Sequence, residues 1–114
     1  MAADPVIPFP SLTFEQQTSG ETVTLLCHGK IVSDTAPMLQ EEVRKQIAQS
    51  SVVVLDLGDI RYMDSSGLGA LVGLYVSAKR AGKQLKLVHL SDRVRELLRL
   101  SKLLNVFEGY GGYL

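Results

Sequence analysis

The sequence predicts an α/β domain in which buried strands alternate with helices. Val52–Leu55 is an unbroken aliphatic run, too short for a helix and typical of a strand buried on both faces. The segment after it has apolar residues at the spacing of one helix face, namely Leu68, Leu71, Val72 and Tyr75. The alternating run Lys83–Leu90 follows. A strand, a helix and a strand in this order predict a right-handed crossover between two parallel strands.

The region before this unit predicts a β-hairpin. Residues 1–10 contain three of the four prolines and predict an extended lead-in, so the single domain is expected to span residues 11–114. Leu12–Gln17 and Thr22–His28 resemble strands and are separated by a polar turn, which predicts an antiparallel pair.

A first helix is predicted after the hairpin. Ser33 or Asp34 is expected to cap it, and Pro37 lies in its first turn, where a missing N–H costs nothing. Its buried stripe is expected to consist of Leu39, Val43 and Ile47.

The later helix boundaries are marked in the same way. Lys79 and Arg80 followed by Gly82 predict the end of the central helix, because cations and a glycine favour helix C-termini. Ser91 is expected to cap a third helix, and Leu103–Phe107 predicts a last short strand.

Composition narrows the class of protein. The chain of 114 residues is 46% hydrophobic and 21% charged, and its 12 basic residues balance 12 acidic ones, which does not indicate nucleic acid or an anionic membrane as partner. The single cysteine, Cys27, excludes an intrachain disulfide and is expected to be a buried thiol. Because neither a signal peptide nor a transmembrane run is recognisable, we expect a cytoplasmic protein.

The segment Met63–Gly67 joins the central strand to its helix, at the sheet edge where α/β proteins usually place their function. A nucleophile elbow requires a glycine two residues before its serine, and neither Ser65 nor Ser66 has one. A phosphate-binding loop requires lysine after its last glycine, whereas Leu68 follows Gly67. The sequence therefore does not predict an enzyme.

The histidines and aspartates do not predict a catalytic or metal site either. His28 and His89 are expected to be satisfied histidines near strand ends, because no nucleophile motif accompanies either. Asp56, Asp59 and Asp64 could gather at the sheet edge, but they lack a plausible set of further ligands. We expect neither a metal nor a cofactor.

Two interpretations of the serines remain open on physical grounds. Ser65 or Ser66 can be a helix N-cap, contributing about 1 kcal/mol. Alternatively, one hydroxyl is a substrate for phosphorylation by another protein, since a phosphate there would meet backbone N–H groups and the positive end of the helix dipole.

A resemblance separates these interpretations. Met63–Gly69, MDSSGLG, preceded by VVLDL, resembles the STAS domain family and, within it, the bacterial anti-sigma factor antagonists. The resemblance extends from Gly29 and Asp34–Pro37 to Leu97–Ser101. It implies a mixed sheet of four or five strands with helices packed on one side.

The resemblance also implies a function. In such proteins a serine, here Ser65, is exposed and is phosphorylated by a partner anti-sigma factor that is a serine kinase of the GHKL type. Ser65 is expected to be the more exposed of the two serines, and Ser66 to turn inward and support the helix start. The unphosphorylated protein binds this kinase and frees its sigma factor, and a phosphatase resets the phosphorylated form. The ATP site belongs to the kinase, so the chain itself is not expected to be an enzyme. In agreement with the balanced charge, no direct contact with nucleic acid or membrane is expected either.

The partner-binding surface is expected to combine two neighbouring segments. Its residues are Val32, Ser33, Asp34, Met63, Asp64, Ser66, Gly67 and Leu68. Family members usually carry an acidic residue where this chain has Val32, so one expected partner-facing carboxylate is missing unless Asp34 substitutes for it. This departure leaves one alternative open, a STAS scaffold or transporter-associated accessory domain of the stressosome or lipid-transport type.

Overall fold

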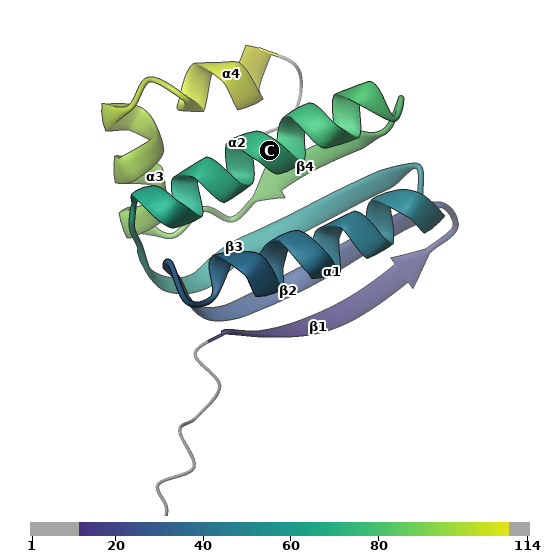
Figure 1. Cartoon of the computed structure of the whole chain (residues 1–114), viewed down its shortest axis with the longest axis horizontal. Helices are drawn as coiled ribbons and strands as arrows, with labels where there is room; N and C mark the ends of the chain where they lie inside the picture. The colour runs from purple at the N-terminus through teal and green to yellow at the C-terminus, as the bar shows by residue number, and fades with distance from the viewer. Residues whose placement is uncertain (1–11, 110–114) are drawn as a thin grey trace, which may run out of the picture.

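The computed structural model describes residues 12–109, which form a four-stranded mixed sheet with helices. The elements are β1 (Leu12–Ser19), β2 (Thr22–Ile31), α1 (Ala36–Gln49), β3 (Val52–Met63), α2 (Ser65–Arg80), β4 (Gln84–Val88), α3 (Asp92–Leu100) and α4 (Leu104–Gly109). The strand order is β1-β2-β3-β4 (Figure 1). The α/β class and the mixed sheet expected from sequence are therefore confirmed. The expected lead-in of residues 1–10 lies outside the described residues.

The sheet combines one antiparallel pair with two parallel pairs. β1 pairs antiparallel with β2, and Gly20 closes their turn with φ +60°, a conformation that favours glycine. β2–β3 and β3–β4 are parallel, and α1 and α2 make the two connections. The pairing of β2 with β3 shifts register twice near the carboxyl end of β2, which reaches Ile31 rather than the expected His28.

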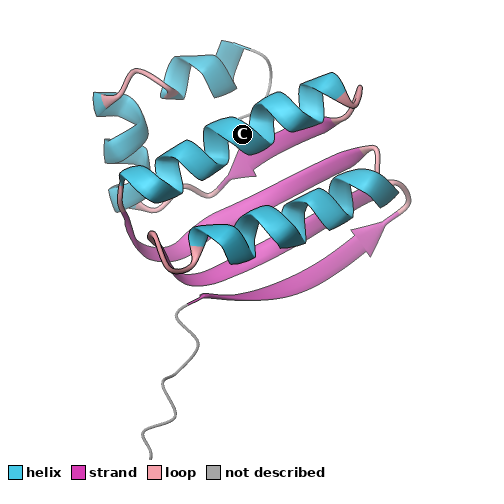
Figure 2. Cartoon of the chain, viewed as in Figure 1, coloured by secondary structure: helices cyan, strands magenta, loops and turns pink. Residues whose placement is uncertain are grey.

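Helices α1 and α2 cover one face of the sheet (Figure 2). The expected helical stripe of α1 is buried, as are Leu71 and Leu74 of α2 and alternating residues of the strands, such as Leu25 and Leu55. Burying a leucine contributes about 1.5–3 kcal/mol, so this two-layer core accounts for most of the fold's stability. The expected ends of α2 are also present, with Lys79 and Arg80 in its last turn and Gly82 at φ +71°.

The C-terminal part corrects one expectation. Leu103–Phe107 was predicted as a strand, but Leu104–Gly109 forms the short helix α4. The Phe107 N–H bonds the carbonyl of Leu103, and the Phe107 ring packs edge-on against Tyr75 of α2 with centroids 5.0 Å apart. Burial of this aromatic pair favours the helix, because it brings Phe107 to the α2 surface.

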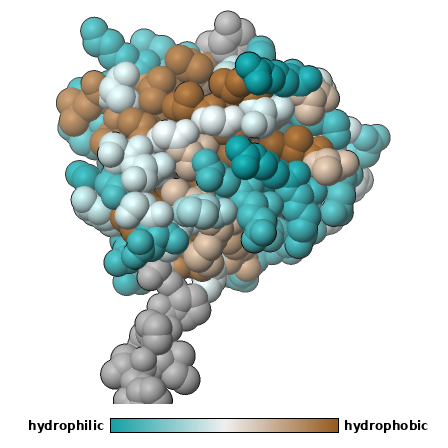
Figure 3. All heavy atoms as spheres, in the orientation of Figure 1, coloured by the Kyte–Doolittle hydropathy of each residue, from teal (hydrophilic) through white to brown (hydrophobic). Residues whose placement is uncertain are grey.

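The helix-bearing side exposes part of its apolar surface. Apolar side chains gather over the upper part of this face, where Figure 1 places α2, α3 and α4 (Figure 3). Three exposed apolar residues belong to these helices, namely Val76, Leu100 and Val106. No helix within residues 12–109 is both long and apolar enough to cross a membrane.

Candidate functional site

Asp64 is the residue that turns the chain from β3 into α2. Its backbone is extended, and its carboxylate accepts hydrogen bonds from the N–H groups of Ser66, at 2.9 Å, and Gly67, at 3.2 Å. Of the two interpretations left open for Ser65 and Ser66, the helix N-cap does not apply, because Asp64 is the N-cap. A carboxylate at this position satisfies two orphan donors and also meets the positive end of the helix dipole.

Capping by Asp64 leaves the Ser65 hydroxyl without a structural task. Ser65 is the first residue of α2 and is exposed, whereas Ser66 is half-buried, as expected. Within residues 12–109, no group forms a hydrogen bond with the Ser65 hydroxyl. A serine in this position can be modified without breaking any bond that holds the turn.

Gly67 fixes the start of α2 against the end of β2. A Cβ at this position would lie 2.5 Å from the carbonyl oxygen of Ile31 and 2.7 Å from Cγ of Met63. Both Ile31 and Met63 are fully buried. Only glycine allows this close approach. It holds the segment Met63–Gly67, called the Ser65 turn below, beside the β2–α1 loop.

The β2–α1 loop is tied by Thr35. The Thr35 hydroxyl donates to the carbonyl of Lys30 and accepts from the N–H of Val32, both at 2.9 Å, and Thr35 is only 2% exposed. Thr35 is also the N-cap position of α1, so the expected cap at Ser33 or Asp34 is wrong. Thr35 was not among the residues predicted from the sequence, although a threonine directly before a helical Ala-Pro was a possible signal.

The two loops meet at one sheet edge. The N–H of Asp64 donates to the carbonyl of Ile31 at 3.3 Å, so the segment after Ile31 adjoins the Ser65 turn. Of the expected partner-binding residues, Ser33 and Asp34 are exposed, and the half-buried ones are Val32, Asp64, Ser66 and Leu68. Met63 and Gly67 are buried and support these residues from below.

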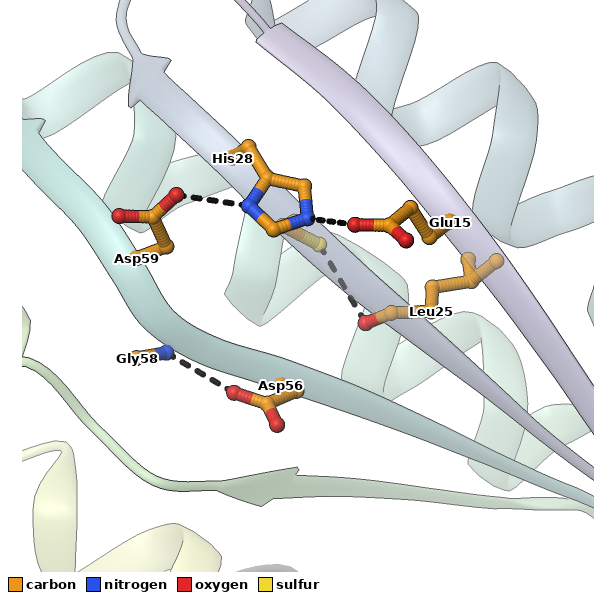
Figure 4. A network of polar contacts seen from close by, with 7 residues as sticks. Glu15, Leu25, His28, Asp56, Gly58 and Asp59 are labelled. Atoms are coloured by element: carbon orange, nitrogen blue, oxygen red, sulfur yellow. Dashed lines mark hydrogen bonds and ion pairs between the residues drawn. The ribbon is translucent and has the colours of Figure 1, made fainter.

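A second polar cluster spans β1, β2 and β3 (Figure 4). His28 Nδ1 lies 2.6 Å from a carboxylate oxygen of Asp59, and Nε2 lies 2.6 Å from one of Glu15. The hydrogen bond with Asp59 is the largest influence on the pKa of His28 and raises it. Desolvation comes next and lowers the pKa, and the hydrogen bond and charge of Glu15 raise it again, so that it lies above its ordinary value. His28 is thus a satisfied histidine, as expected, with a carboxylate at each ring nitrogen.

Neighbouring groups have separate partners. Asp56 accepts from the N–H of Gly58 and pairs with His89 Nδ1 at 2.8 Å. Cys27 is buried as expected, and burial, followed by the charge of Asp56, raises the pKa of its thiol to about 12. Within the described residues, no three His, Cys, Asp or Glu side chains are grouped so as to hold a metal ion.

Comparison with known proteins identifies the family. The model of the STAS domain matches residues 13–111. The anti-sigma-B factor antagonist of Bacillus subtilis is 35% identical over 80 residues, which cover 70% of this chain and 73% of that protein. The solved structure of the unphosphorylated anti-sigma factor antagonist SpoIIAA matches with a TM-score of 0.70 at 18% identity and covers 90% of this chain and 86% of that one. Its phosphorylated form matches with a TM-score of 0.68 at 17% identity and covers 90% and 89%. The chain therefore belongs to the STAS domain family.

Proposed function

We propose that this chain is an anti-sigma factor antagonist that is switched off by phosphorylation of Ser65. In this proposal the unphosphorylated form binds an anti-sigma factor that is a serine kinase of the GHKL type, and thereby releases a sigma factor. The observation that carries it is the exposed, unbonded hydroxyl of Ser65 on a turn held by Asp64 and Gly67. The name of the Bacillus subtilis relative supports the antagonist role.

The proposed chemistry requires nothing catalytic from this chain. The kinase would transfer the γ-phosphoryl group of ATP to Ser65 Oγ, so that a P–O bond forms at Oγ and ADP leaves. The hydroxyl proton would pass to a base of the kinase. A separate phosphatase would hydrolyse the phosphate and restore the hydroxyl. The role of this chain is to present the serine, which its exposure at the helix start favours.

The partner surface would lie around this serine. Ser33 and Asp34 are the exposed residues of the adjoining loop. Asp34 would supply the carboxylate that is missing at Val32. Leu68, half-buried one turn into α2, adds an apolar contact beside Ser65. The whole surface is continuous, because the backbone bond between Asp64 and Ile31 joins its two parts.

Incubation with ATP and the candidate anti-sigma kinases encoded in the same genome tests the proposal. We expect mass spectrometry to find phosphate on Ser65, and we expect Ser65→Ala to abolish labelling. Ser66→Ala is the matched control, because it removes the neighbouring half-buried hydroxyl, and it should be labelled like the parent. Labelling that persists in Ser65→Ala and vanishes in Ser66→Ala would misplace the site, and no binding or labelling by any such kinase would contradict the function.

A further inference from the structure

Arg93, in the first turn of α3, is held at the end of β3. Its guanidinium carbon lies 4.8 Å from the centroid of the Tyr62 ring, and its Nη2 donates to the carbonyl of Met63 at 3.4 Å. The position of α3 is itself fixed, because Ser91 donates to the carbonyl of Ile60 at 2.7 Å and caps the helix. The backbone of α3 therefore places a cation at the strand end that leads into the Ser65 turn.

The guanidinium is within reach of Ser65. Met63, which it contacts, precedes Ser65 by two residues, and two residues of extended chain span at most about 7 Å. Arginine also has a long side chain that can swing about its stem. The present contacts of Arg93 are weak, because 3.4 Å is long for a hydrogen bond and Tyr62 is 45% exposed. Little is lost when the guanidinium moves.

The local charges favour such a move after phosphorylation. The Asp64 carboxylate is already bonded to two N–H groups of α2, and Asp34 is exposed on the adjoining loop. A phosphate on Ser65 adds up to about two negative charges beside them. Lys30 pairs in register with Tyr62 on the neighbouring strand, and the guanidinium of Arg93 contacts the backbone where β3 leads into this turn.

We propose that Arg93 is the counter-ion of phosphorylated Ser65. Its guanidinium would move away from the Met63 carbonyl and the Tyr62 ring and form a charge-assisted hydrogen bond with the phosphate. This inference rests on the proposed phosphorylation of Ser65. Arginine is suited to the task because its planar fork can bond two phosphate oxygens at once. Phosphorylation would then change the surface twice, by adding an anion at Ser65 and by removing a cation from Tyr62.

The titration of the phosphate itself tests this pairing. Phosphoserine can be installed at position 65 during translation, without any kinase, and followed by phosphorus NMR as pH is varied. We expect the second pKa of the phosphate to lie below its ordinary value of about 6, and Arg93→Gln to raise it by about half a unit. Arg93→Lys, which keeps the charge but loses the fork, should fall between them. Arg99→Gln is the matched control, because Arg99 is an exposed arginine of the same helix that pairs with Glu96 at 2.8 Å, and it should leave the titration unchanged.

The nitrogen resonance of Arg93 Nε provides a second measurement that needs no substitution there. In the phosphorylated chain the chemical shift of Arg93 Nε should change with pH, with the same midpoint as the titration of the phosphate. In the unphosphorylated chain it should show no change at that pH. Equal phosphate titrations in the parent and Arg93→Gln, or an Arg93 signal that ignores the phosphate, would overturn the inference. Failure of every kinase to label Ser65 would instead contradict the proposed function, because the installed phosphoserine does not depend on a kinase.

Discussion

The Ser65 turn and the His28 cluster use polar groups in opposite ways. In the turn, the Asp64 side chain bonds backbone N–H groups, and the Ser65 hydroxyl takes no part in holding the structure. Around His28, side chains bond one another across three strands, with carboxylates on both sides of one ring. The conformation of the turn is therefore set by hydrogen bonds to backbone N–H groups, whereas the contacts of the cluster depend on the protonation of His28.

This difference has a consequence for regulation. A modification of Ser65 changes the charge of the surface but breaks no bond of the turn, so it can alter recognition without unfolding. Protonation of His28 instead acts on the link between β1 and β3. The two regions should respond independently, which variants in each can test.

The largest effect is expected for Ser65→Asp on partner binding. At the exposed helix start the new charge meets favourable N–H groups, while repulsion from Asp64 costs only about 1 kcal/mol, so the melting temperature should stay close to that of the parent. Buried against a partner, the charge costs several kcal/mol, which corresponds to about a hundredfold loss of affinity or more. Calorimetric titration with the anti-sigma kinase measures this loss, and Ser65→Ala should bind like the parent. A Ser65→Asp variant that melts far earlier would show that the switch is a folding event.

A smaller effect, on stability, is expected for Gly67→Ala. The added Cβ would lie 2.5 Å from the Ile31 carbonyl oxygen, so backbone must shift, at a cost of about 1–3 kcal/mol or more. Gly69→Ala is the matched control, because a Cβ there meets nothing within 4 Å, and it should stabilise the helix by up to about 1 kcal/mol. Urea unfolding measures both. Equal stabilities of the two variants would mean that the turn does not depend on the close approach of β2.

Sequence alone predicted the parts of this fold that depend on local patterns. The aliphatic run at Val52–Leu55 and the apolar spacing after it indicated a strand and an amphipathic helix, and both elements are present. The buried faces differ from the prediction. The strand was expected to be buried on both faces, but only Val53 and Leu55 are buried, because helices cover one face of the sheet (Figure 2). In α2, Leu71 and Leu74 are buried, whereas the other expected stripe residues, Leu68, Val72 and Tyr75, are half-buried. The exposure of Ser65 relative to Ser66 was also predicted. The cap was not, because Asp64, Ser65 and Ser66 are all good capping residues and the choice depends on where β3 ends.

The remaining features depend on contacts between distant segments. Leu103–Phe107 fits a strand as well as a helix, and only its packing on Tyr75 decides between them. The partners of His28 follow from the register of β1 and β2 and from the irregular pairing of β2 with β3. Arg93 reaches the Met63 carbonyl only because α3 packs along the end of β3. No single segment of sequence contains this information.

The smallest effect is expected from the titration of His28. Its pKa is raised in the folded protein, so its contribution to stability is fully present below about pH 6.5, the unfolded value, and is lost as pH rises through the folded pKa. Stability of the parent should therefore fall relative to His28→Gln over this window, by less than Gly67→Ala costs, because the cluster is solvent-exposed. NMR titration of the ring gives the pKa directly. Asp59→Asn should lower it more than Glu15→Gln does, since the bond with Asp59 is the largest cause of the shift. A pKa that neither substitution changes would show that the two carboxylates do not hold the imidazolium, and the contrast with the Ser65 turn would then disappear.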